Sequence, residues 1–261
     1  MNRPDNDALR EEVRNRYADI ARGEGSCCCD ECGPTARSAA EYAAKLGYLP
    51  EDVLSVPEGA DMGLGCGNPN AIAGLKQGET VLDLGSGGGL DCFLAARQVG
   101  SEGNVIGVDM TPDMVSKARR NAREAGCTNV DFRLGEIEHL PVADGTVDVI
   151  LSNCVINLSP DKQSVFNEAF RVLRAGGRLA ISDVVAVKPL PERVVGDVGA
   201  YCGCIGGAAL ISDIEVMLRE AGFSDIRVAV KPESAEIISG WQDGRGYEEF
   251  VRSALISAVK K

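Results

Sequence analysis

The chain has 261 residues, and 44% of them are hydrophobic, which is enough to bury the core of one large domain or of one domain with an appendage. Lys and Arg number 27 against 39 Asp and Glu, so the net charge is −12, and no basic run stands out. This balance argues against nucleic acid or an anionic membrane as the partner, and we expect a small-molecule substrate.

The N-terminal stretch has no features of a targeting or membrane segment. It is charged from Arg3 to Arg16, and no part of the chain approaches the roughly eighteen apolar residues of a membrane span. We therefore expect a cytoplasmic protein, with a monomer as the default state.

Ten cysteines and a single histidine limit the chemistry of the protein. In a reducing compartment, thiols serve as metal ligands, redox groups or nucleophiles rather than as a static disulfide framework. His139 alone cannot form an imidazole-rich zinc site, and we expect it in an exposed turn. The cysteines are therefore the candidates in this protein for binding a soft metal or metalloid and for redox reactions.

Two helices separated by a cysteine-rich loop are predicted near the N-terminus. Asp5 or Asp7 can cap the first helix, whose apolar positions recur at helical spacing until Gly23. Thr35 caps the second helix, and Pro50 then opens a short turn. Between the helices lies a polar, glycine-flanked segment, which we expect to be mobile and which holds Cys27, Cys28, Cys29 and Cys32.

The stretch from Thr80 to Asp91, TVLDLGSGGGLD, indicates a buried strand and a glycine turn that runs into a helix. Glycines let a ligand touch the backbone, and free N–H groups at a helix start suit a polar or anionic group. The dinucleotide fingerprint would need glycine or alanine where Leu90 stands, so the spacing is G-x-G-x-G instead. About twenty residues further on, Asp109 ends a second apolar strand, where its carboxylate can accept both ribose hydroxyls.

This pairing resembles motif I and the ribose acid of the class I S-adenosylmethionine-dependent methyltransferases. The resemblance implies an α/β, Rossmann-like fold with a doubly wound, mostly parallel sheet and an antiparallel seventh strand. The alternation of strand and helix patterns along the chain independently predicts a doubly wound parallel sheet. The strands are predicted over residues 81–84, 104–109, 130–134, 147–151, 178–185 and 226–230.

Several element ends are predicted in the second half of the chain. One helix stops at Gly176 and Gly177, and Ser212 with Glu215 forms a capping box for a later helix. Residues 196–207 are glycine-rich and are predicted to form an insertion outside the core. The last run, 250–259, alternates weakly and fits a helix or a strand; the resemblance to the fold favours the antiparallel seventh strand.

Three thiols are candidates for one site at the carboxyl edge of the sheet, where open α/β sheets bind ligands. Cys154 lies just past the fourth strand, although on its own it fits a small apolar filler better than a ligand. Cys66 and Cys204 lie in glycine-rich loops that we expect to be flexible, where a buried structural thiol has little reason to be. Three thiolates without imidazole suit a pyramidal centre on a soft, thiophilic element better than tetrahedral zinc. We expect packing or surface roles for Cys92, Cys127 and Cys202.

Five strings together resemble the arsenite methyltransferase family: DLGSGGGLDC, VIGVDMT, SNCVINLSPDKQ, FRVLRAGGRLAISDV and CIGGA. In that family three cysteines bind trivalent arsenic, and they match Cys66, Cys154 and Cys204. A further N-terminal cysteine takes part in disulfide exchange; Cys32 is the best match, and Cys28 or Cys29 could serve instead. The resemblance divides the chain into N-terminal helices with the cysteine loop (1–60), the S-adenosylmethionine-binding domain (61–188) and an arsenic-binding portion that completes the sheet (189–261).

The resemblance implies S-adenosylmethionine as methyl donor and arsenite and methylarsenite as substrates, in arsenic detoxification. Displacement of the sulfonium methyl by the arsenic lone pair needs positioning more than acid–base help, so the lack of a histidine base is no objection. Methyl transfer formally oxidises arsenic, and a pair of thiols can reduce it by forming a disulfide that glutathione or thioredoxin then clears.

The residues assigned to the cofactor lie at the carboxyl ends of the first four strands. The methionine end and the loop are assigned to Asp83, Gly85, Ser86, Gly87 and Gly89, with the backbone of Ser152 and Asn153 near the methionine end. Ribose and adenine are assigned to Asp109 and Met110, with Glu136 and Ile137 beside the adenine ring. Asp91 either contacts the cofactor amino group or caps its helix. Glu136 fits an ordinary solvated turn residue as well as it fits a cofactor contact.

Two other functions stay open at this point. A small-molecule C- or O-methyltransferase of the quinone-biosynthesis type would share the fold and the cofactor motifs, but it needs no trio of loop thiols. A thiol-based metal binder would use Cys29 and Cys32 as half of a zinc site, but no second C-x-x-C occurs in the chain.

Overall fold

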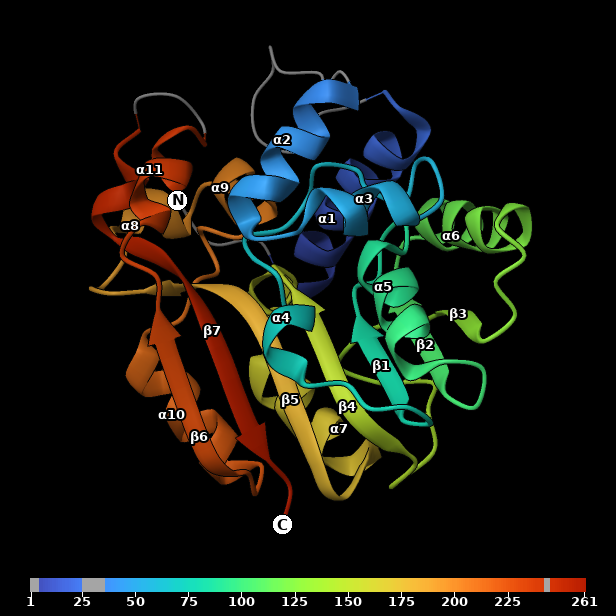
Figure 1. Ribbon diagram of the computed structural model, residues 1–261. Coiled ribbons are helices and arrows are strands. Elements are labelled where there is room, and N and C mark those ends of the chain that lie inside the picture. The colour runs from blue at the N-terminus through green and yellow to red at the C-terminus, as the bar shows by residue number, and fades with distance from the viewer. Residues whose placement is uncertain (1–4, 25–35, 242–244) are drawn as a thin grey trace.

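The computed structural model describes residues 5–24, 36–241 and 245–261, which are built around one mixed sheet (Figure 1). Within these residues the sheet has seven strands in the order β3-β2-β1-β4-β5-β7-β6. The pairings among β1 to β5 are parallel, whereas β7 runs antiparallel to both β5 and β6. The predicted doubly wound sheet with an antiparallel seventh strand is therefore confirmed.

Successive residues of the central strands pack on opposite faces of the sheet. Val81 belongs to the core that α4, α5 and α6 cover, and Leu82 to the core that α7 and α10 cover. Burial on both faces explains why these strands read as unbroken apolar runs. The strands are β1 (Thr80–Leu84), β2 (Asn104–Asp109), β3 (Val130–Leu134), β4 (Val147–Asn153), β5 (Leu173–Ala186), β6 (Ser224–Val230) and β7 (Val251–Val259). The covering helices are α4 (Asn70–Ala73), α5 (Leu90–Val99), α6 (Pro112–Glu124), α7 (Lys162–Val172) and α10 (Ile211–Glu220).

The strand order reverses between β1 and β4. From β1 the chain continues outward to β2 and β3, and it then returns to place β4 on the other side of β1. The carboxyl ends of these strands bound the crevice in which open α/β sheets bind ligands.

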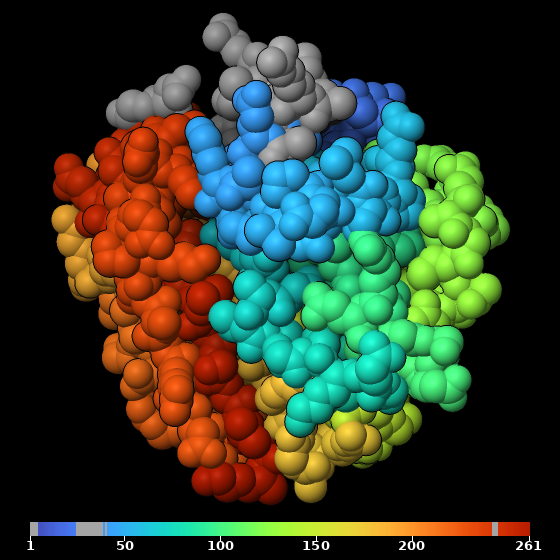
Figure 2. All heavy atoms as spheres, in the orientation of Figure 1, coloured from blue at the N-terminus to red at the C-terminus, as the bar shows by residue number. Residues whose placement is uncertain are grey.

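The N-terminal helices lie over this edge of the sheet, at the top of Figure 1. They are α1 (Asn6–Arg22), α2 (Ala36–Leu46) and α3 (Pro50–Ser55). As predicted, Asp5 caps α1 by accepting a hydrogen bond from the Ala8 N–H at 2.8 Å, and Gly23 ends the helix with φ of 79°. Figure 2 shows the blue α2 and α3 layer resting on the teal and green part of the domain.

Short helices link the C-terminal strands: η1 (Ile156–Leu158), α8 (Glu192–Val195), α9 (Val198–Cys202), α11 (Ser234–Ser239) and η2 (Tyr247–Glu249). Because β7 inserts between β5 and β6, the C-terminal portion completes the sheet, while the domain limits given above stay predictions. Among the described residues, no helix has both the length and the apolar character needed to cross a membrane.

Two predicted element ends are wrong. The helix α7 ends at Val172 rather than at the glycine pair, because Leu173 already pairs with Val147 and begins β5. Gly176, with φ of 81°, lies inside β5 where the pairing with β4 is irregular. The helix α10 begins one residue before Ser212, so this serine lies in the first turn and forms no capping box.

Candidate active site

A cleft lies at the carboxyl edge of the sheet, between the strand ends and α1. The turn after β1 lines it with Gly85, Ser86 and Gly87. Gly87 has φ of 51°, and a Cβ there would meet no atom within 4 Å, so its backbone is open to a ligand. Gly85 has φ of 67°, and a Cβ there would lie 2.4 Å from the Val155 side chain. Gly89 does not line this cleft and serves instead as the N-cap of α5.

Asp109 ends β2 and holds the glycine turn in place. Its carboxylate accepts hydrogen bonds from the backbone N–H of Gly87 at 3.0 Å and of Thr111 at 2.8 Å. Burial raises the pKa of Asp109, and these backbone hydrogen bonds oppose the rise. Asp109 and Met110 both line the cleft, and their contacts with ribose and adenine stay predictions.

Two more carboxylates, Asp83 and Asp91, are buried at the same cleft. Burial is the largest cause that raises the pKa of each, and the charge of Asp91 raises the pKa of Asp83 further. Buried carboxylates of this kind favour a ligand that brings positive charge. S-adenosylmethionine carries a sulfonium and an ammonium group, so the acids of this cleft fit the cofactor.

Asp91 does not cap α5, since Gly89 occupies the N-cap position. Its carboxylate instead accepts hydrogen bonds from the Tyr48 hydroxyl at 2.8 Å, the Asn70 amide at 2.7 Å and the Asn153 amide at 3.3 Å. Asp91 is therefore a fixed acid in the wall of the cleft.

The segment after β3 places Ile137 and Glu138 on the cleft, but not Glu136. The Glu136 carboxylate lies 3.3 Å from the Arg14 guanidinium of α1. Glu138 pairs with Arg10 of α1, also at 3.3 Å. Ile137 therefore lines the cleft, and its contact with the cofactor stays a prediction, whereas Glu136 pairs with α1.

The end of β4 carries three consecutive residues of interest. Ser152 is fully buried, and its hydroxyl lies 3.4 Å from the Leu84 carbonyl oxygen rather than on the cleft. Asn153 and Cys154 both line the cleft.

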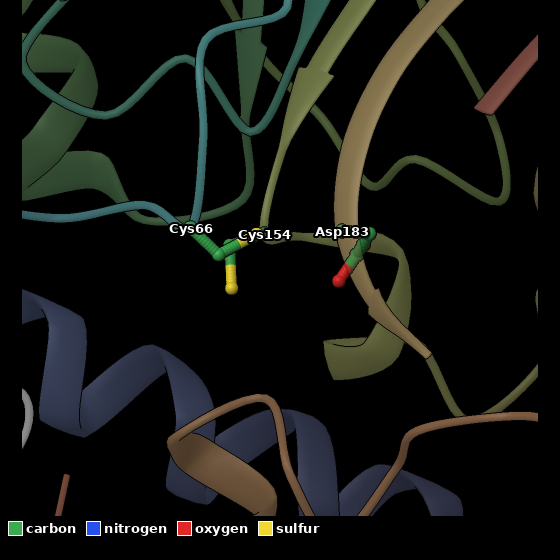
Figure 3. Close-up of side chains that lie close together, drawn as sticks. All are labelled: Cys66, Cys154 and Asp183. Carbon is green, nitrogen blue, oxygen red and sulfur yellow. The ribbon is translucent and has the colours of Figure 1, made fainter. Parts of the chain in front are cut away.

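Cys154 is the centre of a cluster of thiols. Its Sγ, the Cys66 Sγ and a carboxylate oxygen of Asp183 all lie within 4.8 Å of one another (Figure 3). The Cys204 thiol donates a hydrogen bond to the Cys154 carbonyl oxygen at 2.8 Å. Hydrogen bonds with the Cys204 and Cys66 thiols, together with burial, raise the pKa of Cys154 well above its usual value. The structure thus brings together the three cysteines that the sequence singled out.

Two of these cysteines have an unusual backbone. Cys154 has φ of 60° and Cys204 has φ of 63°; among described non-glycine residues, only Asp225 shares a positive φ. Such a conformation costs about 1–3 kcal/mol per residue and persists where the surroundings enforce it, often at functional sites. Two cysteines with strained backbones that contact each other therefore indicate a functional site rather than a purely structural contact.

The loops that carry Cys66 and Cys204 are packed, contrary to expectation. The two residues are only 3% and 2% exposed. Residues 196–207 form α9 and the turn that follows it. Tyr201 of α9 is fully buried in the same hydrophobic cluster as Val13 of α1, so this segment is part of the core. Its glycines serve close packing: a Cβ on Gly207 would lie 2.1 Å from a backbone oxygen.

Comparison with known proteins identifies the family. A family model described as a methyltransferase domain matches residues 75–222. An arsenite methyltransferase of Halobacterium salinarum is 53% identical over 98% of this chain and 68% of its own length. The chain belongs to the arsenite methyltransferase family. Another member, from Aquipseudomonas alcaligenes, is 41% identical over 84% of this chain and 63% of its own length, so the chain spans about two thirds of these relatives.

A solved structure of the family has the same fold. The arsenic(III) S-adenosylmethionine methyltransferase from Chlamydomonas reinhardtii is 34% identical to this chain and superposes with a TM-score of 0.64. The match covers 85% of this chain and 73% of that one.

The remaining cysteines of this family member fall into three groups. Cys202 lies on the cleft and is buried, and its predicted packing role stays a prediction. Cys92 is buried in α5, where its thiol donates to Asp83 at 3.3 Å, and Cys127 is half-buried. All of these, and the three clustered thiols, are free of disulfides. The predicted redox cysteine, Cys32, and its alternatives, Cys28 and Cys29, lie outside the described residues, as does Cys27.

Asp183 belongs to the thiol cluster and was missed by sequence reasoning. It lies in β5, and its carboxylate faces the two thiols in Figure 3. The carboxylate accepts hydrogen bonds from the Ile156 N–H at 2.8 Å, the Asn157 amide at 2.9 Å and the Val184 N–H at 2.7 Å. The available signal was an acid inside the apolar run LAISDVV near the carboxyl end of a strand.

Asp183 should make stability depend on pH. Burial raises the pKa of Asp183 from 3.8 to about 6. Between these values the folded state retains a proton that the unfolded state has lost, so this contribution to stability falls as pH rises, by up to about 3 kcal/mol. We expect the unfolding free energy of wild type, relative to an Asp183→Asn variant, to decline across this window in urea titrations. A difference that does not vary with pH would contradict the assignment.

Proposed function

We propose that this protein transfers methyl groups from S-adenosylmethionine to trivalent arsenic held by Cys66, Cys154 and Cys204. The observation that carries the proposal is the meeting of three buried thiols beside a cleft whose acids fit the cofactor. The arsenite methyltransferase of Halobacterium salinarum, 53% identical over nearly the whole chain, supports the same substrate.

The cofactor would be held by residues at the ends of β1 and β2. Asp109 would accept the ribose hydroxyls, Met110 and Ile137 would contact the adenine, and Asp83 and Asp91 would face the positive charges. When bound, S-adenosylmethionine supplies a methyl group activated by its positively charged sulfur. The protein itself positions the two reactants. Cys154 lies on the same cleft as the proposed cofactor residues, which would place arsenic within reach of that methyl group.

The thiols are suited to neutral arsenous acid, As(OH)₃. Because the pKa of Cys154 is raised, its thiol is protonated before the substrate binds. Each thiol can give its proton to a departing hydroxide, which leaves as water while an As–S bond forms. Exchange of three hydroxyls releases three waters and leaves no net charge in a buried site, which avoids the cost of burying unpaired thiolates. Arsenic is then pyramidal, and its lone pair is free to attack.

The arsenic product must be reduced before a second cycle. Formation of the As–C bond takes two electrons from arsenic, which becomes formally pentavalent. Two sulfurs can return these electrons by breaking their bonds to arsenic and forming a disulfide, while a water molecule or an external thiol binds in their place and releases a proton, which restores neutral trivalent arsenic. Glutathione or thioredoxin would then reduce the disulfide by thiol exchange. We place the protein in the cytoplasm, where such reductants are abundant.

The N-terminal cysteine offers a specific prediction. If Cys32 serves only in the reduction step, Cys32→Ser should slow formation of dimethylated arsenic several-fold more than formation of the monomethylated product. The two rates are measured by separating arsenic species over time. Cys28→Ser and Cys29→Ser are the matched variants, and equal losses at both methylation steps would remove Cys32 from this role.

The proposed function is tested with arsenite, methyl-labelled S-adenosylmethionine and a thiol. We expect label in methylarsenicals with wild type and none with Cys66→Ser. Absence of labelled arsenic, with the cofactor still bound, would overturn the proposal and favour a quinone-type methyltransferase. Stoichiometric zinc binding without cofactor binding would favour the thiol-based metal binder instead.

A further inference from the structure

Asn153 connects the loop of Cys66 to the wall of the cofactor cleft. Its Oδ1 accepts a hydrogen bond from the Cys66 backbone N–H at 3.0 Å, and its Nδ2 donates to the Gly67 carbonyl oxygen at 2.7 Å. One amide therefore holds both sides of the residue that carries the thiol. Since Asn153 directly precedes Cys154, its hydrogen bonds join the two thiol-bearing segments.

The loop fits tightly around this amide. A Cβ on Gly65 would lie 2.8 Å from the Asn153 Nδ2, and a Cβ on Gly67 would lie 2.2 Å from the Ser182 hydroxyl. The Cys66 Sγ lies 3.8 Å from the same Ser182 hydroxyl. The two glycines let the loop lie between Asn153 and Ser182, so the position of the Cys66 thiol depends on the orientation of the Asn153 amide.

The same amide reaches the acid of the cofactor cleft. Its Nδ2 donates to the Tyr48 hydroxyl at 2.9 Å, and that hydroxyl donates to Asp91 at 2.8 Å. A longer contact of 3.3 Å joins Nδ2 to Asp91 directly. Burial and the charge of Asp91 raise the pKa of Tyr48, so its hydroxyl keeps the proton that it donates. A short hydrogen-bonded chain thus runs from Asp91 through Tyr48 and Asn153 to Cys66.

We propose that Asn153 is a positioning residue through which the cofactor and arsenite favour each other's binding. The proposal rests on the function proposed above. The ammonium group of the ligand, which S-adenosylhomocysteine also carries, would add a further partner to the Asp91 carboxylate and so restrict the Tyr48 hydroxyl and the Asn153 amide that already hydrogen-bond to it. The Cys66 loop would then have fewer conformations to lose when arsenite binds, which raises the affinity for arsenite. Linkage requires that arsenite raise the affinity for the cofactor by the same factor.

The test measures binding rather than turnover. Arsenite is titrated calorimetrically into the full chain with and without S-adenosylhomocysteine, which has no methyl group to transfer. For wild type we expect arsenite to bind about 5-fold tighter or more when S-adenosylhomocysteine is present. In Asn153→Ala this ratio should fall to about one. The matched control is Asn129→Ala, because Asn129 also donates to backbone carbonyls but lies away from the site, and its ratio should equal that of wild type.

A second variant separates coupling from general damage. Tyr48→Phe removes the hydroxyl that links Asn153 to Asp91, but it leaves the contact between Asn153 and the Cys66 N–H. We expect arsenite affinity without S-adenosylhomocysteine to change less than 3-fold, while the ratio falls toward one. A wild-type ratio of one, or a wild-type ratio retained in Asn153→Ala and Tyr48→Phe, would overturn the coupling. Failure of wild type to bind arsenite would overturn the proposed function itself and the coupling with it.

Discussion

Replacing Cys154 with serine is expected to lower kcat/KM for arsenite methylation by about 10³-fold or more. Cys154 is the thiol that contacts both Cys66 and Cys204, so its loss removes one ligand and separates the other two. A serine hydroxyl is a hard ligand that offers trivalent arsenic nothing beyond what water offers. The expected loss corresponds to about 4 kcal/mol, which is below the roughly 7–11 kcal/mol that positioning contributes in well-oriented reactions.

The Cys154→Ser variant should still bind S-adenosylhomocysteine within a few-fold of wild type. The acids proposed to bind the cofactor, Asp83, Asp91 and Asp109, form their hydrogen bonds without the Cys154 thiol. Calorimetry with S-adenosylhomocysteine and a methylation assay on the same preparation separate the two effects. Cys127→Ser is the matched control, since this thiol follows α6 away from the cluster, and it should keep full activity. Methylation by Cys154→Ser at the wild-type rate would remove Cys154 from the site.

Replacing Asp109 with asparagine is expected to weaken binding of S-adenosylhomocysteine by roughly 10- to 100-fold. A hydrogen bond to a charged group contributes about 1.5–3 kcal/mol, and asparagine keeps one acceptor oxygen but loses the charge and the second acceptor. In wild type the backbone N–H groups of Gly87 and Thr111 donate to the Asp109 carboxylate. In the variant the new NH₂ group would face one of these N–H groups, so two donors would meet without an acceptor. The dissociation constant is measured by calorimetry.

Arsenite binding without the cofactor should change little in Asp109→Asn, because Asp109 does not contact the thiol cluster. The matched control is Asp131→Asn, an exposed acid of the neighbouring strand that pairs with Arg133, and its cofactor affinity should equal that of wild type. Unchanged S-adenosylhomocysteine affinity in Asp109→Asn would show that this acid does not bind the ribose.

The fold could be predicted because its sequence pattern repeats. Apolar runs separated by amphipathic helices predict a doubly wound sheet, and the structure has a strand at each of the six predicted places, while the seventh was favoured over a helix by the resemblance to the fold. The errors come from places where tertiary contacts override local signals. Gly176 and Gly177 looked like a helix end, but the pairing of Leu173 with Val147 starts the strand earlier. Ser212 looked like a cap, but α10 begins one residue too early for that role.

The candidate site could be predicted in part. The glycine turn and Asp109 follow from the distance between them in the chain, and the three thiols from their positions after strands and in loops. Packing could not be predicted. The glycine-rich sequence of residues 196–207 is typical of an exposed insertion, yet Tyr201 of this segment is buried in the core. Asp183 was missed because its neighbours in sequence are apolar, and only the fold brings it within 4.8 Å of the Cys66 and Cys154 thiols.

X-ray absorption at the arsenic edge, on protein loaded with one equivalent of arsenite, tests the central claim most directly. Arsenic bound by Cys66, Cys154 and Cys204 should show three sulfur neighbours and no oxygen. Cys66→Ser should reduce the sulfur count to two, while Cys127→Ser should leave the spectrum unchanged. An oxygen ligand in wild type, from Asp183 or from water, or an unchanged spectrum in Cys66→Ser, would contradict the three-thiol site.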